Sequence, residues 1–141
     1  MAVIVERTRV ALLPVNAVLV AGATSLFVGA LLSDIAYFRS YEIQWNNFAS
    51  WLLAGGLLVA ALAFLWSIVE LFRARWRMWP AVAYTLLLLA TWILGFIDEL
   101  VHAKDTWATM PGGLVLSAIV VVLACLTLAF AWAGLRTGVA P

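Results

Sequence analysis

Long apolar runs alternate with short polar segments along this chain. The runs cover about residues 14–33, 48–69, 81–97 and 112–133. A helix rises about 1.5 Å per residue, so roughly 20 residues cross a hydrocarbon layer of about 30 Å. The pattern predicts an all-α protein, a four-transmembrane-helix bundle, in which residues 1–141 form a single integral membrane domain. Pro14 is expected in the first turn of the first helix.

The composition agrees with a membrane location. Of the 141 residues, 67% are hydrophobic and 11% are charged, whereas a soluble domain has about 25% charged residues. The lipid bilayer is therefore an expected partner. The net charge of +1 gives no reason to expect nucleic acid. The Ala21-Gly22-Ala23 stretch has the character of a signal-peptidase site, but we expect the first run to be retained as an anchor.

The distribution of basic residues predicts the topology. The ends of the chain and the link between the second and third runs carry six of the eight basic residues: Arg7, Arg9, Arg73, Arg75, Arg77 and Arg136. The other two links carry Arg39 and Lys104. Because basic loops stay in the cytoplasm, we expect cytoplasmic N and C termini in a multi-pass protein of the bacterial inner (plasma) membrane.

Small residues recur at helical spacing within the runs. Such residues let membrane helices approach closely, which matters because lipid provides no hydrophobic drive for association. The positions that we expect to mediate helix packing are Ala21, Ser25, Gly29, Ser33, Gly56, Ala60, Gly95, Gly113 and Ser117.

Ionisable residues gather where the third run ends. Asp98, His102 and Asp105 are spaced i, i+4 and i+7, which places them on one helix face if the helix continues. Asp34 lies at the same expected depth, at the end of the first run. Two or three carboxylates and an imidazole could bind a divalent metal, or relay protons to a quinone headgroup. The alternative is a solvated helix end in which Lys104 pairs with a neighbouring acid.

One stretch resembles a known family. His102, Asp105 and Trp107, followed by residues 111–117, match a "His-x-x-Asp-x-Trp … Pro-x-Gly-Leu-x-Leu-Ser" signature. The chain in this respect resembles a bacterial family of small four-helix inner-membrane proteins of unknown function. Members often carry a His-Pro near the start of the first helix, where this chain has Leu13-Pro14. The resemblance implies a setting near periplasmic dehydrogenases or cytochromes, and it implies no activity.

Two functional hypotheses follow. The first is a non-catalytic subunit or anchor that packs with a membrane or periplasmic redox complex of electron transport, as a homo-oligomer or beside another protein. The second is a small redox or metal/quinone-binding module that uses Asp34, Asp98, His102 and Asp105. The sequence requires no cofactor, although a quinone or a divalent metal would suit this cluster. The absence of nucleophile-elbow, P-loop and HExxH motifs favours a non-enzymatic role without deciding it.

Overall fold

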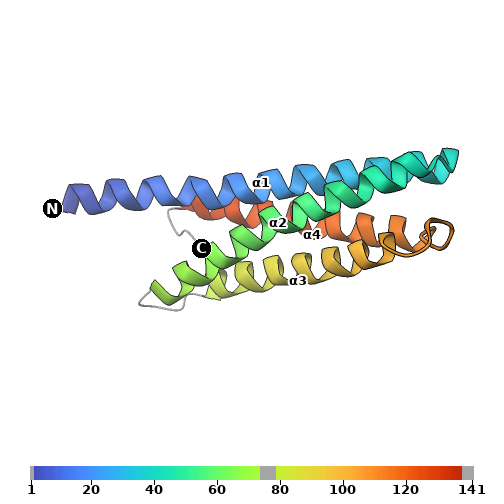
Figure 1. The fold of residues 1–141 in the computed structure, drawn as a ribbon. Helices are drawn as coiled ribbons and strands as arrows, with labels where there is room; N and C mark the ends of the chain where they lie inside the picture. The colour runs from blue at the N-terminus through green and yellow to red at the C-terminus, as the bar shows by residue number, and fades with distance from the viewer. Residues whose placement is uncertain (1, 74–78, 138–141) are drawn as a thin grey trace.

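Four long helices make up the structure (Figure 1). The computed structural model describes residues 2–73 and 79–137, with side chains described for 15–73 and 79–134. The elements are α1 (Ala2–Ser40), α2 (Ile43–Arg73), α3 (Trp79–His102), the short 3₁₀ helix η1 (Thr106–Ala108) and α4 (Gly112–Thr137). The prediction of an all-α, four-helix chain is confirmed.

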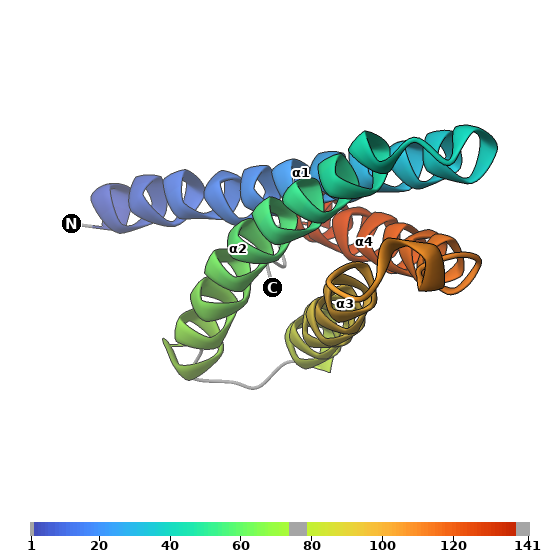
Figure 2. The ribbon, with the colours of Figure 1, turned by 45° about the vertical axis from the view of Figure 1, so that its right-hand side comes forward.

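The helices form a ring in chain order. Each helix packs on its neighbour in sequence, and α4 closes the ring against α1. The α1–α2 turn and the α3–α4 loop lie at one end, here named the hairpin end (Figures 1 and 2). The opposite end, where α2 stops and α3 starts, is named the terminal end because the chain termini lie on that side. Both hairpins therefore point the same way.

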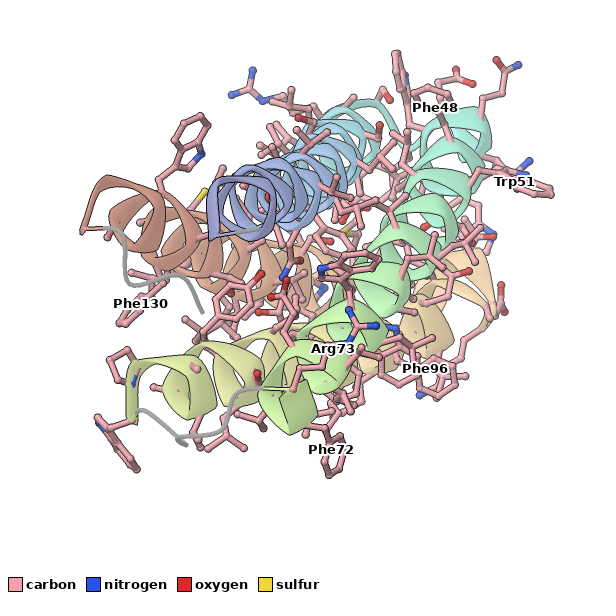
Figure 3. The ribbon with its side chains drawn as sticks, turned by 90° about the vertical axis from the view of Figure 1, so that its left-hand side faces the viewer. Phe48, Trp51, Phe72, Arg73, Phe96 and Phe130 are labelled. Atoms are coloured by element: carbon pink, nitrogen blue, oxygen red, sulfur yellow. The ribbon has the colours of Figure 1, made fainter. Side chains whose placement is uncertain are left out.

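Each helix is long and apolar enough to cross a membrane: the four spans are Val15–Ser40, Ile43–Arg73, Trp79–His102 and Gly112–Gly134. Large apolar side chains project from the outside of the bundle. Phe48, Trp51, Phe72 and Phe130 all point away from the neighbouring helices (Figure 3), and Phe72 is 79% exposed. In a bilayer these side chains contact lipid. Their exposure therefore does not carry the free-energy cost that it would carry in water.

The helices continue past the apolar runs. The first helix starts at Ala2, upstream of Pro14, and the segment expected as a polar link after residue 33 is helical except at Tyr41 and Glu42. Tyr41 has a φ of 54°, and its N–H donates to the carbonyl oxygen of Tyr37 at 2.7 Å, which ends α1. Near lipid, backbone N–H and C=O groups are best satisfied by hydrogen bonds within a helix. The chain therefore stays helical through these polar residues.

Small residues permit close contact around one large side chain at mid-bundle. Phe27 of α1 is 1% exposed and lies against Gly56 and Gly95. A Cβ atom at Gly56 would lie 2.7 Å from Phe27 Cε1, so only glycine fits there. Among the expected packing positions, Ser33, Gly56, Ala60, Gly95, Gly113 and Ser117 are buried, Ala21 and Gly29 are partly buried, and Ser25 is exposed.

Candidate functional site

Four polar side chains meet inside the hairpin end of the bundle. Asp34 comes from α1, Asp98 and His102 from α3, and Ser117 from α4. Both carboxylic residues are 0% exposed, and His102 is 4% exposed. We call these four residues the acid–histidine cluster. Burying an ionisable group in a membrane helix costs free energy, so such a group is a candidate functional residue.

His102 is held by both of its ring nitrogens. Nδ1 lies 2.9 Å from the backbone carbonyl oxygen of Asp98, one helical turn earlier. A carbonyl oxygen only accepts hydrogen bonds, so Nδ1 carries a proton. Nε2 lies 2.7 Å from Asp34 Oδ1, across the α1–α3 gap. A proton therefore lies between these two atoms, on the imidazole or on the carboxyl group.

Ser117 joins the two carboxyl groups. Its Oγ makes a short hydrogen bond with Asp34 Oδ2 and lies 2.8 Å from Asp98 Oδ2. A hydroxyl group has one proton to donate and two lone pairs to accept with. It can donate to only one of the two carboxyl groups, so the second contact requires a proton from the other. One of the two aspartates is accordingly a protonated acid.

The contacts indicate which aspartate is the acid. Both oxygens of Asp34 have partners, which suits a carboxylate. Within the described structure Asp98 Oδ1 has no hydrogen-bond partner, and its distance of 3.3 Å from His102 Nδ1 makes that contact electrostatic. An unpartnered oxygen is cheaper on a neutral acid than on a carboxylate. We therefore assign the acid proton to Asp98 Oδ2, donated to Ser117 Oγ.

This proton count makes the cluster neutral. The four contacts of the cluster each take one proton: Nδ1 to the Asp98 carbonyl, Nε2 to Asp34, Ser117 to Asp34, and Asp98 to Ser117. The Asp34 carboxylate then balances the His102 imidazolium, while Asp98 and Ser117 are uncharged. Neutrality matters because a net charge in a low-dielectric interior is strongly disfavoured. Loss of any one proton leaves the cluster with a charge of −1.

The α3–α4 loop closes over this cluster. Tyr37 of α1 donates from its hydroxyl to the Thr106 carbonyl oxygen at 3.0 Å. Tyr41 stacks on Trp107, with ring centroids 6.4 Å apart. These contacts tie η1 to the end of α1, so the loop lies between the acid–histidine cluster and the surroundings of the hairpin end.

Gly113 sets the distance between α4 and His102. A Cβ atom at this position would lie 2.8 Å from Thr109 Cγ2 and 3.0 Å from His102 Cε1. The first distance is shorter than real Cβ contacts, so a larger residue would push on the loop and on the imidazole. Glycine is thus needed here for the histidine to reach Asp34.

The structure brings together three of the four residues expected to form a site. Asp34, Asp98 and His102 meet, whereas Asp105 is exposed and accepts a hydrogen bond from the Trp107 N–H at the start of η1. Lys104 is also exposed. The hypothesis of a solvated helix end thus describes residues 103–105 and does not describe Asp98 or His102.

Other neighbours were not anticipated. Glu99, one of the acids near Lys104, accepts from the Ser50 hydroxyl of α2 at 2.8 Å. The sequence predicts Ser117 only as a small packing residue, yet it links both carboxyl groups. A serine in an apolar helix one turn after a glycine is typical of packing, so the sequence offered no signal for this role.

A metal ion would have to compete with the protons of the cluster. Both His102 nitrogens and both Asp34 oxygens point at hydrogen-bond partners rather than at a shared centre. In the described parts of the chain, no group of three or more His, Cys, Asp or Glu side chains is arranged to hold a metal ion. The geometry favours proton binding over metal coordination.

Comparisons with known proteins give a family and nothing more specific. A family model described as "Predicted membrane protein (DUF2231)" matches residues 12–139. No curated protein matches the chain, and no solved structure matches it.

Proposed function

The chain belongs to the family of predicted membrane proteins DUF2231, and from this premise we propose that it is a proton-binding module of the membrane. The acid–histidine cluster takes up and releases the proton. The observation that carries this proposal is the position of Ser117 Oγ within hydrogen-bond distance of both Asp34 and Asp98. That geometry needs a protonated carboxyl group, and it gives the proton a defined place.

Release of the proton from the cluster depends on the charge of the groups around it. Because the intact cluster is neutral and buried, deprotonation creates a net negative charge inside the membrane. Release therefore requires compensation, for example when a neighbouring group becomes more positive. Redox reactions of a quinone or of a quinone-linked protein change charge and consume or supply protons. A membrane redox partner of this class would suit the cluster, with Asp34, Asp98 and His102 as the residues that exchange protons.

Infrared spectroscopy of the purified protein tests the proposal. A protonated carboxylic acid has a carbonyl stretching band that a carboxylate lacks. We expect this band at neutral pH in the wild-type chain, and we expect Asp98→Asn to remove the part of it that comes from the acid–histidine cluster. Asp105→Asn is the matched control, because the same substitution falls on an exposed acid outside the cluster.

The outcomes separate clearly. Loss of the band in Asp98→Asn and its retention in Asp105→Asn support the proposal. If the wild-type band is absent at neutral pH, both aspartates are ionised and the proposal is wrong. Circular dichroism of each variant checks that the helices are intact before the bands are compared.

A second candidate function is a non-catalytic anchor that packs with a redox complex. It is supported by how little of the described chain lies outside the helices: two residues join α1 to α2, and residues 103–111 join α3 to α4. Purification from native membranes in mild detergent tests it. Recovery of a stoichiometric redox protein supports an anchor, whereas recovery of this chain alone contradicts it.

The orientation in a bacterial inner membrane is part of the proposal. Arg39 and Lys104 lie at the hairpin end, and Arg73 lies at the terminal end. The other basic residues that predict a cytoplasmic terminal end lie outside the described residues: Arg75 and Arg77, and the side chains of Arg7, Arg9 and Arg136. Cysteine labelling from one side of the membrane tests this. Labelling of Lys104→Cys from the cytoplasm would reverse the orientation.

A further inference from the structure

A second group of buried polar side chains lies far from the acid–histidine cluster, towards the terminal end. Asn16 comes from α1, Glu70 from α2 and Tyr84 from α3. Asn16 is 5% exposed and Tyr84 is 1% exposed, while Glu70 is partly buried. Tyr84 lies in an apolar cluster with Ala17, Ala63 and Ala131, so its hydroxyl is surrounded mainly by hydrocarbon.

Each of these three side chains has a polar atom without a partner. In the described structure, Asn16 Oδ1, Glu70 Oε2 and Tyr84 Oη are inaccessible to solvent and make no hydrogen bond. The other Glu70 oxygen, Oε1, accepts from Trp66 Nε1 at 2.8 Å. The Asn16 side chain lies within hydrogen-bonding reach of the Tyr84 hydroxyl, and Glu70 acts on that hydroxyl electrostatically, so the three side chains face a common region.

Buried polar atoms are almost always satisfied by protein or by ordered water. Two of the orphan atoms are oxygens that accept, and the tyrosine hydroxyl both donates and accepts. A small molecule that donates two hydrogen bonds and accepts one would satisfy all three. Water, with an exchangeable proton, has this capacity.

We propose that Asn16, Glu70 and Tyr84 bind a water molecule and form a second proton-binding site, through which protons enter or leave the bundle at the terminal end. This inference rests on the proposed function of the acid–histidine cluster, because it gives that cluster a counterpart on the opposite side. Glu70 is the residue that holds the proton, on Oε2. Asn16 and Tyr84 are positioning residues that hold the water molecule.

The groups around Glu70 suit reversible proton binding. Its own helix presents the Trp66 indole and the positive charge of Arg73. The facing helices α1 and α3 present the neutral Asn16 and Tyr84, and α4 contributes apolar residues, including Ala131, to the cluster around Tyr84. No second carboxylate acts on Glu70 among the described residues. A single carboxylate beside one cation and otherwise neutral groups binds one proton and forms a poor site for a divalent cation.

Polar groups also occur between the two sites. Asp98, Thr91 and Tyr84 recur every seven residues on α3, which places them on one face about 10.5 Å apart along the axis. Thr91 Oγ1 lies 3.3 Å from Thr127 Oγ1 of α4, and both residues are buried. Thr24 of α1 donates to the Val20 carbonyl oxygen of its own helix at 2.7 Å, and its Oγ1 lies 3.4 Å from the Ala124 carbonyl oxygen of α4. Hydroxyl groups from three helices thus form a middle level between Glu70 and the acid–histidine cluster.

Proton flux into sealed liposomes tests the inference. The full chain is reconstituted with a pH-sensitive dye inside, and a valinomycin-clamped potassium gradient drives the flux. We expect flux above that of protein-free vesicles, and we expect Glu70→Gln and Tyr84→Phe to reduce it to the protein-free level. Glu42→Gln is the matched control, because Glu42 is exposed at the hairpin end, and this variant should conduct as the wild type does.

The infrared band of the acid–histidine cluster keeps the two proposals apart. If Glu70→Gln retains that band and loses flux, the variant is folded and the second site is supported. If the wild type conducts no better than protein-free vesicles, or if both variants conduct normally, the second site is refuted. The first proposal is then still supported by the infrared band of the acid–histidine cluster. Flux that requires sodium ions would show that the orphan atoms bind a cation, and would also overturn the inference.

Discussion

Replacing Ser117 with alanine removes a hydroxyl group that contacts two carboxyl groups at once. With the acid proton assigned to Asp98, this hydroxyl donates to Asp34 and accepts from Asp98. Its Oγ lies 2.8 Å from Asp98 Oδ2, and Ser117 is 1% exposed, so water does not replace it. A hydrogen bond to a charged group contributes about 1.5–3 kcal/mol and a neutral one about 0.5–1.5 kcal/mol. The two bonds together predict that Ser117→Ala lowers the free energy of unfolding by about 2–4.5 kcal/mol.

The matched control is Ser25→Ala. Ser25 lies on an exposed face of α1, where its hydroxyl donates to the Ala21 carbonyl oxygen of its own helix. A substitution of this kind usually changes stability by about 0.5 kcal/mol or less. Both variants remove one oxygen atom from a serine, so the difference between them isolates the link between the carboxyl groups.

Reversible unfolding in mixed micelles, followed by circular dichroism as the denaturing detergent is increased, measures both free energies. Infrared spectra of the same samples give an independent readout, because the Asp98 acid loses its acceptor and its carbonyl band should shift. An unfolding free energy of Ser117→Ala equal to that of Ser25→Ala, with an unshifted band, would refute the assignment of the bridging proton.

Two further predictions concern the same cluster. Gly113→Ala should push the His102 ring from Asp34 and destabilise the fold by about 1–3 kcal/mol, the usual effect of overpacking; Gly112→Ala, where a Cβ meets nothing within 4 Å, should be neutral in the same unfolding assay, and equal effects would contradict the role of Gly113. The stability of the wild type should fall as pH rises above neutrality, because the native cluster holds more protons than the unfolded chain; each extra proton gives a slope of about −1.4 kcal/mol per pH unit. Asp98→Asn should flatten this slope, and a wild-type stability that rises with pH would show that the cluster binds no extra proton.

The sequence determined the membrane class and the number of helices. Runs of about twenty apolar residues have one stable solution in lipid, a helix with its backbone hydrogen bonds satisfied internally. Helix ends were less well predicted, since residues 34–40 are polar enough to read as a link yet continue α1. The local pattern also indicated Asp98 and His102 as neighbours, because a spacing of four residues places them on one helix face.

Only the tertiary structure decided what that pair of residues does. Asp34 and Ser117 lie 68 and 15 residues from His102 along the chain, and no periodicity within one helix relates them. Their meeting depends on how α1 and α4 are rotated and how closely they approach α3, which glycines such as Gly113 permit. The same packing leaves Asp105 outside and brings Asn16, Glu70 and Tyr84 together. Sequence specifies which side chains a membrane helix carries, and the contacts between helices determine which of them share a proton.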